Sequence, residues 1–130
     1  MIPSYRGLSI DENSKGQWQY GYLIEDNGEA FIINEVIEAN EQYITIGSWN
    51  PVRSETVSQS TGLEDKNDKE IFEGDILKDG SEYGRVVYDP DRTMWRVYGK
   101  DFDDALSDWW TGRVVGNIYE NPELLEADHD

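Results

Sequence analysis

The stretch that decides the fold covers residues 61–77 and reads TGLEDKNDKEIFEGDIL. It predicts a turn at Thr61-Gly62, a charged loop, an apolar anchor at Ile71-Phe72, a second turn at Gly74 and the start of a strand. Glycine permits turn conformations that are closed to residues with a Cβ atom. Asp75 is placed to accept a backbone N–H from its own turn. We therefore expect a structural motif made of Thr61, Gly62, Leu63, Ile71, Phe72, Gly74 and Asp75.

Upstream of this stretch the sequence predicts antiparallel strands. The clearest is residues 17–24, in which Trp18, Tyr20, Tyr22 and Ile24 fall on one face at a period of two. Asn27-Gly28 is a tight hairpin signal, so residues 30–33 are the expected partner strand, continued weakly at 36–37. Residues 38–41 are expected to form a loop and 43–46 a strand, which Trp49-Asn50-Pro51 breaks. Residues 54–57 are either extended or a short turn.

Downstream, strands are predicted at 75–78, 83–88, 94–98 and 113–119, with turns at 79–80 and 89–92. Asp103 or Asp104 is expected to cap one helical turn through Trp109, and Asn121-Pro122 to start a short helix. The predicted fold class is mainly β, with antiparallel strands in two sheets, or one sheet plus a small SH3-like barrel, and one or two short helices. We expect a single domain over 1–130, with lobes at about 1–60 and 61–125 and a frayed tail at 126–130.

Composition restricts the function classes. The chain has 130 residues and a formal charge of -17, from 11 basic and 28 acidic side chains, so it repels phosphate backbones and anionic lipid. We expect no direct nucleic-acid binding and no membrane partner. Cys is absent and the single His is His129, which excludes thiolate chemistry and leaves little room for histidine catalysis. No apolar run has signal-peptide length, so the expected location is the cytoplasm.

Three separated motifs carry a family resemblance: residues 61–77, then GRVVYD at 84–89, then VVGNIYENPELL at 114–125. In this order they resemble the YopX family, small proteins of Gram-positive phages and prophages. The opening Tyr5-Arg6-Gly7 and residues 16–23 are also similar to the family's start, whereas residues 35–52 carry none of its motifs. Asp68 stands where the family's loop usually has glycine, and Ser60 where an aromatic residue is usual. The resemblance implies a mostly β fold, self-assembly and no catalytic residues.

No catalytic, cofactor-binding or metal-binding residues are predicted. Segments starting at Asp65, Asp89 and Asp101 lack the glycine and glutamate of an EF-hand loop, which favours solvated acidic loops over calcium sites. Nothing fixes a pair of carboxylates of the kind that glycosidases use. The aromatic residues of 18–22 offer a platform for stacking bases, but a hydrophobic strand face is the favoured interpretation.

The Trp109-Trp110 pair is the main candidate for an interaction site. Adjacent indoles point to different sides of most local structures, so one of them is expected at an interface, where Trp is enriched. The candidate interface is therefore Trp109, Trp110 and Arg113. The leading hypothesis is a non-enzymatic phage or prophage accessory protein that binds a host or phage protein or forms a homo-oligomer. The alternatives are an acidic mimic of nucleic acid that inhibits a host DNA-binding protein and, third, a hydrolase with paired carboxylates.

Overall fold

The computed structural model describes residues 4–126, so His129 and all of the predicted tail except Glu126 lie outside the described residues. The fold is mainly β, with two antiparallel sheets of strand order β4-β3-β2-β1-β5-β6 and β10-β9-β8-β7-β11. This confirms the two-sheet form of the prediction, and within residues 4–126 neither sheet closes into a barrel. The chain divides between Gln59 and Ser60 into two compact units, and each is described by itself.

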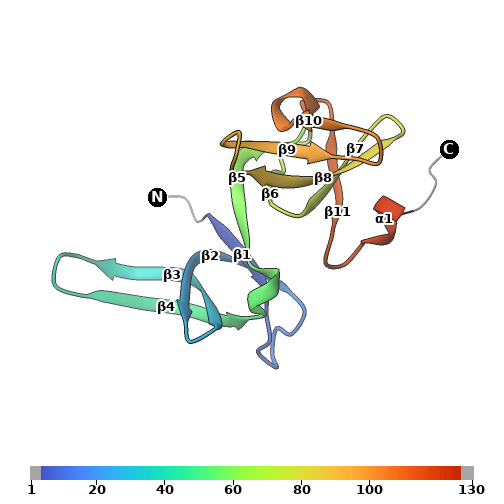
Figure 1. The fold of residues 1–130 in the computed structure, drawn as a ribbon. Coiled ribbons are helices and arrows are strands. Elements are labelled where there is room, and N and C mark those ends of the chain that lie inside the picture. The colour runs from blue at the N-terminus through green and yellow to red at the C-terminus, as the bar shows by residue number, and fades with distance from the viewer. Residues whose placement is uncertain (1–3, 127–130) are drawn as a thin grey trace. The chain divides into compact units, whose positions relative to one another are not determined.

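Unit 1 contains four complete strands and the start of a fifth (Figure 1). Their bounds are β1 Tyr5–Leu8, β2 Trp18–Asp26, β3 Glu29–Ala39, β4 Ile44–Val52 and β5 Ser58–Glu64, with a 3₁₀ turn, η1, at Ser54–Thr56. The predicted hairpin turn is confirmed, since Asn27 and Gly28 join β2 to β3 with φ of 52° and 80°. The core of this unit is Ala30, Ile32 and Val52, against which Tyr5, Leu23 and Val57 pack.

Strands β3 and β4 are longer than the sequence predicts. Strand β3 includes the first two residues of the expected loop, Glu38 and Ala39, because its pairing with β4 outweighs the weak strand preference of its glutamates, while residues 40–41 lie in the loop as predicted. Strand β4 includes Trp49-Asn50-Pro51, which was expected to break it. Proline is tolerated there because β4 ends the strand order of its sheet, and on the outer side Pro51 uses only its carbonyl, which accepts the Ile10 N–H at 3.0 Å. The result is the long hairpin seen in Figure 1.

Unit 2 continues from β5 and holds the five-stranded sheet. Its other elements are β6 Glu70–Phe72, β7 Asp75–Asp79, β8 Glu82–Asp89, β9 Met94–Tyr98, β10 Asp103–Ala105, the 3₁₀ turn η2 Leu106–Trp109, β11 Arg113–Asn117 and the short helix α1 Glu123–Glu126. The core consists of Ile71, Leu77, Val86, Val97, Leu106 and Trp109, with Trp95, Phe102 and Val114 packed against it. Four of the five strands of this sheet were predicted, and β10 was not.

Two local predictions in unit 2 are wrong. Thr61-Gly62 is no turn but part of β5, where the positive φ of Gly62, 79°, accompanies a register shift against β6. Such a shift marks a β-bulge, which glycine at positive φ favours. Neither Asp103 nor Asp104 caps the turn before Trp109, because both lie in β10 and the cap position is Ala105.

Candidate protein-interaction surface

The acidic loop of the deciding stretch is organised by one buried side chain, Asp65. Its Oδ1 accepts the backbone N–H of Asn67 at 2.8 Å and of Lys69 at 2.9 Å, and its Oδ2 accepts the N–H of Val114 at 2.8 Å. Burial by itself raises the pKa of Asp65, but the three N–H donors outweigh burial and lower the pKa below its ordinary value. The ionised carboxylate therefore holds the loop against β11.

The backbone of Gly74 connects the other two sequence motifs, residues 84–89 and 114–125. Its N–H donates to the carbonyl of Val86, and its carbonyl accepts the N–H of Ile118, both at 2.9 Å. Its φ of 85° confirms the predicted second turn, and Asp75 Oδ2 accepts the Phe72 N–H at 2.8 Å as expected. Ile71 and Phe72 are buried, as the anchor prediction requires. The three sequence motifs thus meet within unit 2. There the carboxylates of Asp65 and Asp75 accept hydrogen bonds from backbone N–H groups.

The carboxylates with shifted pKa do not resemble a general acid. Burial raises the pKa of Asp103, but Arg96 and Arg92, 2.6 and 3.2 Å away, lower it further than burial raises it. Hydrogen bonds from its own backbone and from Arg53 lower the pKa of Glu55. A general acid needs a raised pKa, and the shifts at Asp65, Asp103 and Glu55 all run downward.

Two other site types find no counterpart in the described part of the chain. Among residues 4–126, no group of three or more His, Asp or Glu side chains is arranged to hold a metal ion. Over the same residues, no helix has the length and apolar character needed to span a membrane.

The two adjacent tryptophans of the candidate interface have opposite surroundings. Trp109 is only 4% exposed, stacks on Phe102 with ring centroids 5.4 Å apart, and donates its indole N–H to Asp104 at 3.1 Å. Trp109 is therefore a core residue, and its place in the candidate interface is corrected. Trp110 is 77% exposed, and Arg113 is partly exposed in β11, opposite Lys78 of β7.

An open apolar surface lies instead in unit 1. We call it the open face and define it by seven residues of β2, β3 and β4: Tyr22, Ile24, Ile33, Val36, Ala39, Ile44 and Ile46. They line a groove of about 380 Å³. Ile44 is 65% exposed, although isoleucine is among the residues most often found fully buried.

The register of the hairpins explains why these residues share one side. Tyr22 lies opposite Ile33, Val36 opposite Ile46, and Ala39 opposite Ile44. Directly opposed residues of antiparallel strands project from the same face of a sheet. Three irregularities in the register between Ile33 and Glu38 shift the alternation, and the apolar residues on both sides of them line the same groove.

The predicted alternation of Trp18, Tyr20, Tyr22 and Ile24 is present in β2, but these residues lie on the face of the strand that points away from the core. Tyr20 is 47% exposed and Ile24 46%, whereas Leu23 on the other side packs against the core of unit 1. Trp18 lies under the guanidinium of the buried Arg6, 4.3 Å from its ring centre. The hydrophobic face that the pattern predicts is thus mostly an uncovered one.

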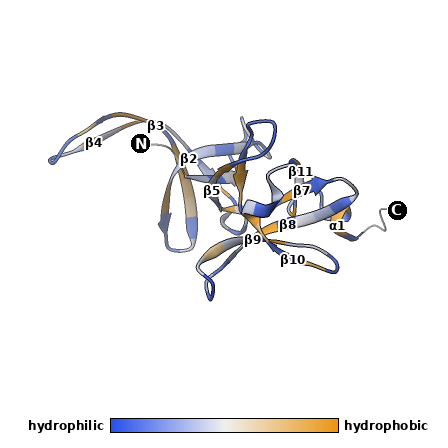
Figure 2. Ribbon diagram, turned by 90° about the horizontal axis from the view of Figure 1, so that it is seen from above, coloured by the Kyte–Doolittle hydropathy of each residue, from blue (hydrophilic) through white to orange (hydrophobic). Residues whose placement is uncertain are grey.

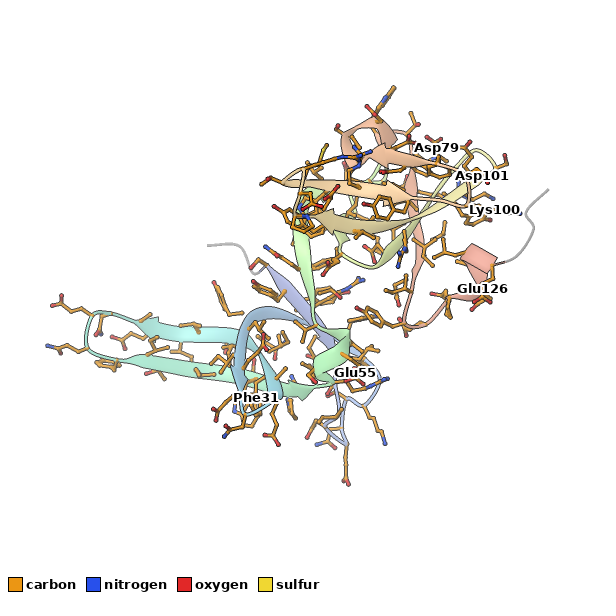
Figure 3. The ribbon with its side chains drawn as sticks, in the orientation of Figure 1. Phe31, Glu55, Asp79, Lys100, Asp101 and Glu126 are labelled. Carbon is orange, nitrogen blue, oxygen red and sulfur yellow. The ribbon has the colours of Figure 1, made fainter. Side chains whose placement is uncertain are left out.

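The outer parts of β3 and β4, with the turn between them, form an arm that we define as residues 35–49. Each of these residues is exposed, and Figure 3 shows their side chains projecting freely on both sides of the ribbon. Figure 2 shows hydrophobic and hydrophilic segments alternating along it. Two of its three glutamates lie away from the open face: Glu38 lies opposite Thr45 and accepts the Tyr43 hydroxyl at 2.9 Å, and the Glu35 carboxylate lies beside Gly47.

One signal in the sequence pointed to this surface. Residues 43–52, YITIGSWNPV, contain no charged side chain in a chain that is 30% charged. The expected break at Pro51 concealed it, because it shortened the predicted strand to four residues.

The mainly β fold, its two antiparallel sheets and the three sequence motifs at 61–77, 84–89 and 114–125 together define the class of protein. The chain belongs to the YopX family, whose sequence profile, described as YopX protein, matches residues 4–126. A solved structure with the same fold is protein EF1440 from Enterococcus faecalis, with 29% sequence identity and a TM-score of 0.66. The alignment covers 96% of this chain and 99% of that one. Among curated proteins, none matches the sequence.

Proposed function

We propose that this chain is a non-enzymatic module that binds protein through the open face of unit 1. The observation that carries the proposal is the composition of that face: seven apolar side chains and no charged one, on a chain of charge -17. Exposed apolar patches rimmed by polar residues commonly mark protein-interaction sites. The centres of protein interfaces are likewise depleted of charged residues.

The resemblance to the YopX family bears on where the protein acts. Resemblance to proteins of Gram-positive phages and prophages favours an accessory protein that acts in the cytoplasm of a host cell. Non-enzymatic action is favoured by the use of Asp65 and Asp75 as acceptors for backbone N–H groups and by the lowered pKa of Asp103.

The test is a photo-crosslinking amino acid in place of Ile44, introduced in the cells that make the protein. Ser81, an exposed turn residue of unit 2, is the control position. We expect covalent adducts with a polypeptide, either another protein or the chain itself, from the first position and far fewer from the second. Equal yields from both positions, or turnover of a substrate by the purified chain in an activity screen, would contradict the proposal.

A further inference from the structure

Two acids continue the open face at the end of the β2–β3 hairpin. Asp26 lies opposite Glu29, and it follows Ile24 at the interval of two residues that keeps strand residues on the same side. We infer, resting on the proposed function and naming its partner, that the open face binds a segment of another protein with a particular composition. The segment carries arginine or lysine at the end that meets these acids and apolar residues along the rest.

Within residues 4–126, neither Asp26 nor Glu29 is in an ion pair. Arg53 lines a hollow together with Glu29, but its guanidinium is bound to Glu55 at 2.9 Å. Like charges directly opposite each other destabilise an antiparallel pair of strands. A cation brought by a partner would therefore relieve the repulsion between the two carboxylates.

Opposed acids alone do not mark a site, as the β7–β8 hairpin shows. Asp79 lies opposite Glu82 there, at the same position before a two-residue turn. Asp79 shares its side of the strand with Leu77, which is fully buried in the core of unit 2. Asp26 and Glu29 instead extend an exposed apolar side, so only this pair forms the negative end of an apolar groove.

An aromatic pair adjoins the acids. Phe31, two residues from Glu29, lies opposite Ile24, and its ring meets that of Trp49 edge to face with centroids 5.8 Å apart. Trp49 is 55% exposed and lies opposite Ile33, which places it on the side of the open face. An exposed indole attracts guanidinium and ammonium groups over its face. The same end of the groove thus offers two kinds of contact to a basic side chain.

Charge favours a basic partner over a second copy of this chain. A copy would bring the same two acids and a net charge of -17 to the interface. A basic segment is instead attracted from a distance, and its cation is paired on arrival.

The length of the face sets the length of the segment. Strand β3 spans 11 residues from Glu29, beside the acids, to Ala39, at the far end of the groove. An extended polypeptide rises by about 3.3 Å per residue, as β3 does, so roughly ten residues would cover the groove and reach the acids.

The experiment is a selection from a random library of displayed ten-residue peptides, at physiological salt, against three forms of the full chain. They are the native chain, the neutralised pair Asp26→Asn/Glu29→Gln and the matched control Asp79→Asn/Glu82→Gln. Both double variants remove two charges from the end of a hairpin. We expect the native and control chains to enrich peptides that are basic at one end and apolar along the rest. The neutralised pair should keep the apolar preference and lose the basic one.

A second measurement locates the bound peptide. Fluorescence anisotropy gives the affinity of the most enriched peptide for Ile46→Asn and Thr45→Asn, two neighbours on opposite sides of β4. Ile46→Asn should weaken binding at least about tenfold, because a polar amide replaces an apolar contact. Thr45→Asn should bind like the native chain. Unchanged circular dichroism of each variant shows that it is folded.

Each other outcome overturns the inference. Enrichment of apolar peptides without a basic residue rejects the cation and leaves the proposed function standing. Equal enrichment of basic peptides by all three forms assigns the preference to net charge rather than to Asp26 and Glu29. Equal binding by the two β4 variants places the peptide away from the open face.

The absence of any enrichment rejects a basic segment as the occupant, and photo-crosslinking at Ile44 then decides the proposed function. Adducts of the chain with itself would make a second copy the occupant. Equal yields from Ile44 and Ser81 would contradict the proposed function as well.

Discussion

The carboxylate of Asp65 accepts the backbone N–H of Val114 at 2.8 Å across 49 positions of sequence. The same side chain also accepts the N–H groups of Asn67 and Lys69 from its own loop. One acid thereby fixes both the shape of the charged loop and its attachment to β11. Carboxylates that accept several backbone N–H bonds form some of the stronger hydrogen bonds in proteins.

Removal of this carboxylate should destabilise the protein. We expect Asp65→Ala to lower the free energy of unfolding by roughly 3 kcal/mol or more, because three N–H donors lose a charged acceptor in a buried place. Urea denaturation followed by tryptophan fluorescence measures the loss. Asp101→Ala, a change at an exposed acid, is the control and should stay within about 0.5 kcal/mol of the native chain.

The stabilisation by Asp65 should also depend on pH. Its folded-state pKa lies below the ordinary value of 3.8, so the unfolded chain binds the proton more readily and the contribution is fully present above that value. It is lost as the pH falls through the folded-state pKa. The difference in unfolding free energy between the native chain and Asp65→Asn should therefore shrink below pH 3.8. A difference that stays constant down to pH 2 would show that the carboxylate's charge is not responsible.

Asp68 occupies a conformation that suits glycine better. Its φ is 64°, in the left-handed region, at the position where the YopX loop usually has glycine. Left-handed backbone costs a residue with a Cβ about 1–2 kcal/mol, while the greater unfolded-state entropy of glycine offsets about 0.5–1 kcal/mol. We expect Asp68→Gly to raise the free energy of unfolding by up to about 1.5 kcal/mol. Asp91→Gly, at a turn position whose φ is not positive, should lower it.

Substitutions at Trp109 and Trp110 compare a buried tryptophan with an exposed neighbour that serves as its control. Trp109→Ala removes a buried indole and its stacking on Phe102 and should cost about 3–5 kcal/mol. Trp110→Ala changes an exposed side chain and should cost less than about 0.5 kcal/mol. Thermal unfolding followed by circular dichroism separates the two. A large loss at Trp110 would mean that its surface is covered in solution.

Local chemistry made some features predictable. Asn27-Gly28 and Gly74 were identified because a residue tolerant of positive φ marks a tight turn whatever surrounds it. The strands 83–88 and 94–98 were identified by composition and by the turn between them, and β8 and β9 pair there. These signals depend on residues close together in the chain.

The rest depends on tertiary position. Pro51 breaks a central strand but not an edge strand, and the sequence does not say where in the sheet β4 lies. Alternation in β2 separates two faces without saying which one is covered, so the aromatic face was not recognised as the open one. The link between Asp65 and Val114 leaves no local trace, because its partner is a backbone N–H that any residue but proline supplies.

Every residue from 35 to 49 is exposed. The side chains that this arm offers for binding are therefore not the ones that stabilise the fold, whereas in most proteins the same side chains serve both purposes. Binding sites are usually strained or poorly packed at some cost to stability, so improving one tends to harm the other. Here the described core clusters take no residue from the arm, and changes on it should leave unfolding nearly unaffected. Under the proposed function, the arm could therefore be changed to suit a different partner, by mutation in nature or by design, without replacing a residue of either core cluster.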